Sequence, residues 1–392
     1  MTAWLEIVGV GESEMPVLPS AEDIIGPKRL LDRLPAGHRL EPWRSPKLDL
    51  MLEQVMAHRG RPTVILASGD PMWFGIGATL ARHLDAGEFR VHPHVSSFQL
   101  AAARLGWPLQ HVTTLSLHGR PAELIQPHVA PGVRILALTT GAETPGYVAR
   151  LLVARGYGRT RLTVLDNLSA PDERVQSAQA VGYGLTAGPF HVLAIDCVAD
   201  AGAPLLAAVP GLPDEAFVTD GQLTKREVRA VSLARLSPYP GALLWDVGAG
   251  CGSIGIEWMR AARDTSALAF EREGERLQMI AVNAERLGVP TLQIVPGEVP
   301  DTLVGKPVPD AIFVGGGVAD EPLFHACWTA LRPGGRLVAN AVTLDGEAAL
   351  QARQSRLGGD LVRIEVSALD SIGAQRVMRP RMAVTQWAVS KP

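Results

Sequence analysis

Residues 244–257 read LWDVGAGCGSIGIE, an apolar run that contains Asp246, continues through closely spaced glycines and ends in an amphipathic stretch. The glycines at 248, 250, 252 and 255 allow the backbone to turn sharply and to approach a ligand closely. The helix that follows such a turn starts with backbone N–H groups that have no partner inside the helix. The pattern therefore predicts a strand, a glycine turn and a helix that together bind a nucleotide-type cofactor.

Two cofactor classes fit this glycine spacing. Residues 250–255, GCGSIG, satisfy the dinucleotide fingerprint G-x-G-x-x-G. Asp246, two residues before the first glycine, completes the spacing D-x-G-x-G-x-G, which resembles the first motif of Rossmann-type S-adenosylmethionine (SAM) methyltransferases. A second acid, Glu271, ends the next apolar run, where a carboxylate can bind ribose hydroxyls. We favour SAM; a glycine turn without a ligand is the alternative.

Composition indicates two globular domains. The chain has 392 residues, of which 47% are hydrophobic, and its mean hydropathy is +0.13. No apolar run approaches the roughly 18 residues of a membrane helix, and the N-terminus lacks a basic signal-peptide segment, so we expect a soluble, cytoplasmic protein with no membrane partner. Cys197, Cys251 and Cys327 are far apart, which predicts neither disulfides nor a metal site. The net charge of −3 and 5% aromatic residues argue against a nucleic-acid partner.

A domain boundary is expected between Cys197 and Thr219. This stretch is rich in alanine, proline and glycine and shows no sustained strand or helix period. We therefore predict one domain at 1–200, another at 213–392, and a poorly ordered linker between them.

The C-terminal half predicts a doubly wound α/β sheet. Helical stretches at 275–287 and 322–331 lie between some of the first five apolar runs, which favours parallel βαβ units. The last two runs have no convincing helix between them and indicate a closing antiparallel pair. The result is a seven-stranded Rossmann-like sheet, with strands expected at 242–247, 267–271, 292–295, 311–314, 336–340, 361–366 and 383–389.

The N-terminal half also alternates apolar runs with polar or glycine-rich turns, starting with the run at 5–10 that Gly11 follows. Asp70 and Pro71 follow Gly69 at the end of another run, and ligands gather at such strand ends in open α/β sheets. This half is therefore expected to be an α/β domain whose cleft is built from strand-end loops.

The order of short motifs adds a family resemblance. The N-terminal series VGVG (8–11), SGDPMWFG (68–75), HPHVSS (92–97), SLHGR (116–120) and NLSAPDER (167–174) resembles the two-lobed tetrapyrrole methylases of the cobalamin and sirohaem pathways. The C-terminal series resembles corrin-pathway methyltransferases of Rossmann type, with LTKREVRA (223–230), the glycine turn, PGEVPDTL (296–303), FVGGG (313–317) and LRPGGRLVANAVTL (331–344). Both series on one chain resemble the fused corrin-pathway enzymes.

This resemblance implies an activity. Such enzymes methylate a precorrin at carbons 5 and 15 and remove carbon dioxide from an acetate side chain, with one SAM bound per domain. The substrate would be a polycarboxylated tetrapyrrole, and we expect a homo-oligomer. We assign the decarboxylation to the C-terminal half, because the resemblance there is to the corrin enzyme associated with carbon dioxide loss.

The resemblance also implies cofactor-binding residues. Asp246 and the 248–252 loop would lie near the methionine end of SAM, Glu271 at the ribose, and Glu298 or the Val299 backbone beside adenine. The full set expected to bind SAM is Gly9, Gly11, Gly69, Asp70, Ser96 and Ser97 in the first domain, and Thr224, Asp246, Gly248, Ala249, Gly250, Cys251, Gly252, Glu271, Glu298 and Val299 in the second.

Acidic substrate arms need cationic donors, and arginine suits bidentate carboxylate recognition. Arg226 and His118 are the candidates for a catalytic role, while Lys225, Arg229, Arg120 and Arg379 are candidates for substrate binding. The plainer interpretation is that these arginines and Lys225 are solvated surface residues and His118 is a structural histidine.

Two positions depart from the family pattern. Glu12-Ser13 follows Gly11 where many relatives carry Pro-Gly, and His94 stands where a glycine is usual. Both lie in loops expected near the N-terminal SAM. Two other functions also stay open: an RNA methyltransferase, and a chain in which one half is a non-catalytic SAM-binding scaffold for the other.

Overall fold

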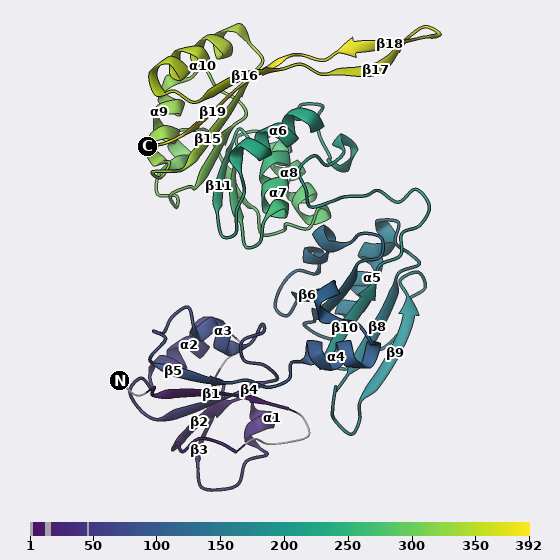
Figure 1. Cartoon of the computed structure of the whole chain (residues 1–392), viewed down its shortest axis with the longest axis vertical. Helices are drawn as coiled ribbons and strands as arrows, with labels where there is room; N and C mark the ends of the chain where they lie inside the picture. The colour runs from purple at the N-terminus through teal and green to yellow at the C-terminus, as the bar shows by residue number, and fades with distance from the viewer. Residues whose placement is uncertain (1–2, 12–16, 45–46) are drawn as a thin grey trace. The chain divides into compact units, whose positions relative to one another are not determined.

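The chain forms two compact units in a computed structural model that describes residues 3–11, 17–44 and 47–392 (Figure 1). The first unit comprises the residues up to Ala122 together with Pro131–Ala203, and the second comprises Glu123–Ala130 and Pro204–Pro392. Glu12 and Ser13, one of the two departures from the family pattern, lie outside the described residues.

The first unit begins with a five-stranded parallel sheet of order β3-β2-β4-β1-β5. The two long central strands, β1 and β4, are buried along almost their whole length, as expected for parallel strands covered on both faces. The elements of this lobe are β1 (Leu5–Val10), β2 (Asp23–Gly26), α1 (Lys28–Leu31), β3 (Arg39–Pro42), α2 (Leu48–Met56), β4 (Thr63–Ser68), α3 (Ile76–Leu80) and β5 (Phe89–His92).

The second lobe of this unit contains a mixed sheet of order β6-β7-β10-β8-β9. Only β6 and β7 pair in parallel; the other neighbours are antiparallel. Its elements are α4 (Ser97–Leu105), η1 (Leu109–His111), β6 (Val112–Ser116), η2 (Ala122–His128), β7 (Arg134–Leu138), α5 (Thr144–Ala154), β8 (Arg161–Asp166), β9 (Arg174–Gln179) and β10 (His191–Asp196). The prediction of a two-lobed α/β domain is confirmed.

The second unit contains the expected seven-stranded sheet, in the order β13-β12-β11-β14-β15-β19-β16. The first five strands in this order run parallel, and β19 lies antiparallel between β15 and β16. The strands are β11 (Leu243–Val247), β12 (Ser266–Glu271), β13 (Gln293–Pro296), β14 (Ala311–Val314), β15 (Arg336–Ala341), β16 (Asp360–Ile364) and β19 (Val384–Ser390). This confirms the Rossmann-like fold with a closing antiparallel pair.

Two buried clusters cover the two faces of this sheet. Leu244 belongs to one cluster and its neighbour Trp245 to the other, because successive side chains of a strand point to opposite faces. The covering helices are α6 (Arg226–Leu236), α7 (Ser253–Ala261), α8 (Gly274–Arg286), α9 (Glu321–Ala330) and α10 (Leu344–Leu357), with short turns η3 (Asp214–Ala216) and η4 (Asp301–Leu303). The sequence had not indicated α10.

A two-stranded hairpin was also missed. Strands β17 (Ser367–Ile372) and β18 (Gln375–Pro380) pair only with each other, and they project beyond the seven-stranded sheet at the yellow end of Figure 1. Leu369, Ile372 and Met378 on this hairpin expose 58%, 62% and 63% of their surface. Such exposure of large apolar side chains marks a surface suited to protein contact.

The prediction of a poorly ordered linker is wrong. Leu212 and Phe217 are buried in the core of the second unit. The N–H groups of Gly211 and Leu212 donate to the Glu257 carboxylate at 2.6 and 3.1 Å. Isolated apolar residues between prolines and glycines have no period, so the sequence did not reveal that they fill pockets in this core.

No helix within the described residues combines the length and the apolar character needed to cross a bilayer.

Candidate cofactor and substrate sites

The glycine turn after β11 has the conformation that its sequence predicts. Gly248, Gly250 and Gly252 adopt φ angles of 71°, 59° and 81°, a region that side chains with a Cβ rarely enter. Between them, Ala249 and Cys251 point into the core. Gly252 precedes α7 and provides no side-chain cap, so the start of this helix presents N–H groups and a partial positive charge.

A second glycine loop faces the first. A Cβ built on Gly248 would lie 3.2 Å from the Gly316 nitrogen, and one on Gly315 would lie 3.2 Å from the Gly248 oxygen. These loops follow β11 and β14, neighbouring strands whose crossovers leave in opposite directions, and ligands bind at such switch points in open α/β sheets. The two exposed loops therefore pack backbone against backbone at the sheet edge where a cofactor is expected.

Asp246 lies beneath the turn and is 1% exposed. Its Oδ2 accepts a hydrogen bond from the Gly255 N–H in the first turn of α7, at 2.9 Å. Burial raises the pKa of this carboxyl to about 7; the Gly255 N–H opposes the shift, and the nearby Glu271 adds to it. The carboxyl therefore supports the helix start and titrates close to neutral pH, and a cation above it would stabilise its ionised form.

Glu271 ends β12 and is 6% exposed. Its Oε2 accepts from the Gly250 N–H at 2.8 Å, while its Oε1 accepts from the N–H groups of Arg272 and Glu273 at 2.9 and 3.1 Å. A carboxylate oxygen has two lone pairs, so Oε2 keeps capacity for a hydroxyl donor. Glu271 thus fixes the glycine turn and retains the chemistry to bind a ribose.

Glu298 and Val299 follow β13, the next strand along this sheet edge. The Glu298 side chain is 73% exposed and pairs with Arg272 at 3.1 Å. Val299 packs against the core. The structure therefore brings the ends of β11, β12, β13 and β14 to one edge, as parallel pairing requires.

Asn283 of α8 connects the turn to the segment that enters this unit. It is fully buried; its Oδ1 accepts from the Val218 N–H at 2.8 Å, and its Nδ2 donates to the carbonyls of Val218 and Cys251 at 2.9 and 3.0 Å. Gln222, further along that segment, places its carbonyl 3.7 Å from a Cβ built on Gly250. The segment therefore passes close to the glycine turn.

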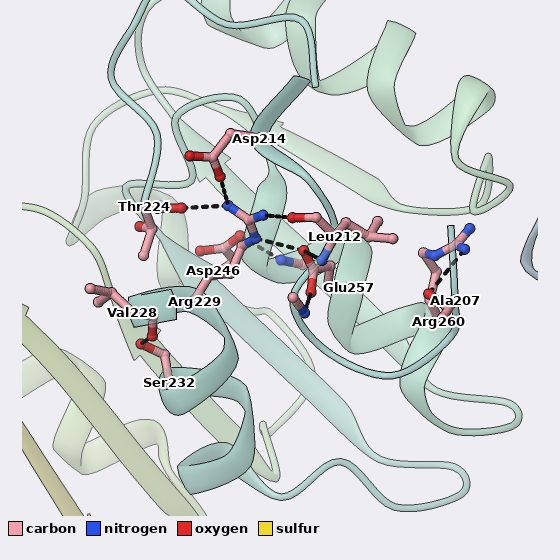
Figure 2. Close-up of polar contacts among 12 residues, drawn as sticks. Ala207, Leu212, Asp214, Thr224, Val228, Arg229, Ser232, Asp246, Glu257 and Arg260 are labelled. Atoms are coloured by element: carbon pink, nitrogen blue, oxygen red, sulfur yellow. Dashed lines mark hydrogen bonds and ion pairs between the residues drawn. The ribbon is translucent and has the colours of Figure 1, made fainter. Parts of the chain in front are cut away.

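The assignment of Arg229 to substrate binding is wrong. Figure 2 shows its guanidinium enclosed by Asp214, Glu257 and the carbonyls of Leu212 and Thr224. The side chain is 0% exposed, and its Nε donates to Glu257 at 2.6 Å. Since the side chain is fully buried and four of its five N–H donors are used inside the protein, Arg229 holds the incoming segment in place and is not accessible to a substrate arm.

Its neighbours remain accessible. Lys225 precedes α6 and is half-buried, and Arg226, the first residue of α6, is exposed. Thr224 is positioned through its carbonyl, which accepts from Arg229. Arg226 and Lys225 therefore retain the possibility of meeting an acidic ligand.

Arg379 is placed differently from the expectation. It lies on β18 and pairs with Asp370 across the hairpin at 2.7 Å, so its guanidinium is engaged locally. Because the hairpin projects beyond the sheet (Figure 1), the structure gives no support for a substrate contact by Arg379.

Taken together, the residues of this edge fit SAM. Two exposed glycine loops pack closely together at the ends of neighbouring strands, and two buried carboxyls lie beneath them to interact with a sulfonium cation and ribose hydroxyls. A dinucleotide would place a pyrophosphate at the turn, where the carboxyl of Asp246 would oppose it. The charge therefore favours SAM over the dinucleotide alternative.

The first lobe also brings its predicted residues together. A Cβ on Gly9 would lie 2.5 Å from the Gly69 oxygen and 2.6 Å from the His94 Cβ, and one on Gly11 would lie 2.8 Å from the His94 ring. A Cβ on Gly69 would lie 3.5 Å from the Ser96 Cα. His94 thus covers the backbone that follows β1.

Two of these residues have local structural roles. Asp70 accepts from the Met72 N–H at 2.8 Å and fixes the turn after β4. Ser96 caps α4 in a reciprocal arrangement with Gln99, and Ser97 begins the helix. Their positions at the carboxyl ends of β4 and β5 are those expected of a ligand-binding edge.

His118 and Arg120 are exposed in the loop after β6. The His118 Nδ1 lies 3.1 Å from the Thr139 carbonyl. Because a carbonyl only accepts hydrogen bonds, Nδ1 carries the proton, and Nε2 of the neutral ring is left with its lone pair. His118 therefore has the tautomer of a proton acceptor.

Three acid–base side chains of the first lobe lie within 4.8 Å of one another: Asp23, Glu41 and His58. The two ring nitrogens of His58 face different carboxylates, Nδ1 toward Asp23 at 3.5 Å and Nε2 toward Glu41 at 3.4 Å. Each ring nitrogen of His58 therefore faces one carboxylate, and the His58 Nδ1 has no hydrogen-bond partner among the described residues.

Sequence reasoning missed several residues that shape the second site. Gly315 and Gly316 were visible in the FVGGG motif, and their repetition after an apolar run was the signal. Arg353 of α10 donates to the carbonyls of Val318 and Asp320, and thereby holds the same loop. Neither Arg353 nor Asn283 has a local sequence signal, because their partners are distant in the chain.

Comparison with known proteins accounts for both units. Residues 18–180 match the tetrapyrrole (corrin/porphyrin) methylases, and residues 215–391 match the precorrin methyltransferase domain. A Sinorhizobium precorrin-6Y C(5,15)-methyltransferase (decarboxylating) is 45% identical over 100% of this chain and 97% of its own length. The chain belongs to this family. The Mycobacterium tuberculosis member is 38% identical over 98% of this chain and 97% of its own length.

Further relatives and one solved domain each align with about half of the chain. A Salmonella typhimurium cobalt-precorrin-6B C(15)-methyltransferase (decarboxylating) is 32% identical over 46% of this chain and 96% of its own length. The cobalt-precorrin-7 C(5)-methyltransferase of the same organism is 30% identical over 44% and 88%. The solved C-terminal domain of the Rhodobacter capsulatus precorrin-6Y enzyme is 38% identical, covers 47% of this chain and 100% of its own, and has a TM-score of 0.46.

Proposed function

We propose that this chain methylates a precorrin at carbons 5 and 15 and removes carbon dioxide from an acetate side chain, as a step of cobalamin biosynthesis. The observation that carries the proposal is the alignment with decarboxylating C(5,15)-methyltransferases along the whole chain, both units included. Membership of this family decides against an RNA methyltransferase.

One SAM is proposed for each unit. When bound, SAM supplies an electrophilic methyl group, and the protein supplies position and charge. In the second unit, Asp246 and the start of α7 face the methionine end, and Glu271 binds the ribose. In the first unit, the loops that carry Gly9, Gly11 and Gly69 would line the SAM site together with His94, which packs against them. Binding of a single SAM per chain in titration calorimetry would instead mean that one half does not bind SAM.

The decarboxylation is assigned to the second unit. Loss of carbon dioxide requires the macrocycle to accept an electron pair, and it is favoured where the departing carboxylate is oriented and desolvated. Arg226 and Lys225 stand at the start of α6, next to Thr224 and the segment that passes the glycine turn. Arg226 is the cation proposed to orient the acetate arm. Two relatives that each match under half of the chain, one named decarboxylating and one not, support a division of labour.

A pair of fragments tests this assignment and the independence of the second unit. We expect residues 204–392 to fold, bind SAM, and convert substrate to a product one methyl heavier and one carbon dioxide lighter. Residues 213–392 should fold less stably, because they lack the Gly211 and Leu212 groups that bind Glu257 and Arg229. Both fragments lack Glu123–Ala130, so their comparison isolates residues 204–212.

Mass spectrometry of the products and urea unfolding of both fragments provide the measurements. Arg226→Ala in the longer fragment should slow the decarboxylated product while SAM affinity is unchanged. If the longer fragment only methylates, and carbon dioxide is released only when residues 1–200 are supplied, the decarboxylation belongs elsewhere.

A relative named C(15)-methyltransferase (decarboxylating) joins the decarboxylation to carbon 15, which leaves carbon 5 for the first unit. In that unit, His118 is proposed to accept a proton during methylation at carbon 5. Its Nδ1 is engaged by the Thr139 carbonyl, so Nε2 is the basic atom. The ring is exposed and free to meet a substrate from the loop after β6.

Self-association is proposed through the hairpin. An isolated two-stranded ribbon is marginally stable in water, and the exposed Leu369, Ile372 and Met378 would be covered by a second copy of the chain. We expect Leu369→Asp with Met378→Asp to reduce the molar mass in light scattering, whereas Val304→Asp, which is 83% exposed outside the hairpin, should not. An unchanged mass in the hairpin variant contradicts this interface.

A further inference from the structure

A cavity in the second lobe of the first unit is lined by two arginines. It measures about 330 Å³, and its lining residues are Arg120, Ala122, Glu143, Thr144, Tyr147 and Arg150. A water molecule takes up about 30 Å³ in the liquid, so the space admits a carboxylic acid side chain together with solvent. Arg120 and Arg150 reach it from different elements, the loop after β6 and helix α5.

The charge of this cavity is not balanced. Among the ion pairs found between described residues, none includes Arg120 or Arg150, whereas many other arginines of the first unit pair with an acid. Glu143 contributes one negative charge against two positive ones. Arg150 also lies over the Tyr147 ring at 5.3 Å, which limits the positions that its guanidinium can take.

The backbone adds to this potential. Helix α5 begins beside the cavity, with Glu143 at its N-cap position, no side-chain cap and a proline in its first turn. The N–H groups of Thr144 and Tyr147 donate to the carbonyls of Gly141 and Glu143, so the helix start contributes mainly its macrodipole, which favours an anion. Two guanidinium groups, one from the loop after β6 and one from α5, therefore line one space beside the start of that helix, an arrangement that suits a carboxylate.

We propose that this cavity is a carboxylate subsite that holds an acidic arm of the tetrapyrrole while the first unit methylates it. The inference rests on the proposed function and deepens it, because it names the groups that bind the substrate's side chain. Arg120 lies two residues after His118 in the same loop. An arm held by Arg120 and Arg150 would therefore place the macrocycle near the proton acceptor proposed above.

Porphyrin binding to the full-length protein tests the subsite without turnover. The probe is uroporphyrin, whose side chains are all carboxylic acids, and its methyl ester is the uncharged control. We expect Arg150→Met and Arg120→Met each to weaken uroporphyrin binding about tenfold, the loss typical of a charge-assisted hydrogen bond. The double variant should lose less than the product of the two, because both groups would bind one carboxylate. Arg161→Met, an exposed arginine of the same lobe outside the cavity, is the matched control.

The methionine part of SAM also carries a carboxylate, and the same variants separate the two sources. Unchanged SAM affinity with weakened porphyrin binding supports the substrate arm. Weakened SAM binding with unchanged porphyrin affinity overturns the proposal, as does equal porphyrin affinity in wild type, Arg150→Met and Arg161→Met.

The proposed function fails by a different measurement. If the wild-type chain does not methylate a precorrin at carbon 5, that function is wrong, whether or not Arg150→Met weakens porphyrin binding. Conversely, normal methylation at carbon 5, with equal porphyrin affinities in the wild type and in Arg150→Met, would rule out only the proposed carboxylate subsite.

Discussion

Arg229→Met should lower the free energy of unfolding of the second unit by about 3–5 kcal/mol, the cost of leaving one member of a buried ion pair without its partner. The Glu257 carboxylate is 2% exposed and would keep only the N–H groups of Gly211 and Leu212. The carbonyls of Leu212 and Thr224 would lose their donor as well. Urea unfolding followed by far-UV circular dichroism measures the change.

The control is Arg263→Met, which removes the same charge from an exposed position of this unit and should change stability by less than about 0.5 kcal/mol. Replacing Arg229 and Glu257 together by methionine should recover part of the loss, because no buried charge is then left unpaired. Equal stability of Arg229→Met and Arg263→Met would show that the polar contacts around Arg229 in Figure 2 are not formed in solution.

Asp246→Asn should weaken SAM binding in the second unit about ten- to a hundredfold at pH 8, the loss expected for one charge-assisted contact. The amide keeps the shape of the side chain and an oxygen for the Gly255 N–H, so the fold should be retained. Methylation by the first unit should continue. Titration calorimetry and product analysis of the full-length chain separate the two sites.

The same carboxyl predicts a pH dependence. Its pKa in the folded protein is about 7, raised mainly by burial from an ordinary 3.8. In the folded protein without SAM, burial favours the protonated Asp246 carboxyl. The contribution of this carboxyl to the free energy of unfolding is therefore present below about pH 4 and is lost as the pH rises through 7. Cationic SAM requires the ionised form, so its affinity should rise up to tenfold per pH unit below 7 and level off above it.

Asp246→Asn removes this titration, and its affinity should be flat between pH 5.5 and 8. A wild-type affinity that is equally flat would mean that the carboxyl is already ionised at pH 5.5 or does not meet the cation. Loss of both methylations with the fold preserved would instead mean that the two sites depend on each other.

The seven-stranded sheet was predictable because its strands are continuous apolar runs separated by turns. Helix α10 was not predictable, because most of its residues are not buried and only Gly346, Leu350 and Arg353 are. The hairpin β17–β18 also alternates weakly and carries charges on both strands. Both elements owe their form to neighbours or to pairing across the chain, which a single window of sequence does not contain.

The candidate site was also predictable only in part from the sequence. The glycine turn, Asp246 and Glu271 follow from local spacing and were expected at this edge. Arg229 was misassigned because an arginine near a helix start is usually solvated, and nothing nearby indicates that Glu257, 28 residues away, lies beneath it. The sequence likewise contains no sign that Asn283 reaches Cys251, 32 residues away. Burial of polar groups depends on the assembled core.

The facing glycine loops also bear on how this protein tolerates inherited change. Every replacement at Gly248 adds a Cβ only 3.2 Å from the Gly316 nitrogen and demands a backbone angle that other residues rarely adopt. A Cβ added at Gly315 would likewise lie 3.2 Å from the Gly248 oxygen. A substitution at either position therefore requires the backbone of the facing loop to shift. A lineage that changed one of the two loops would be expected to change the other as well.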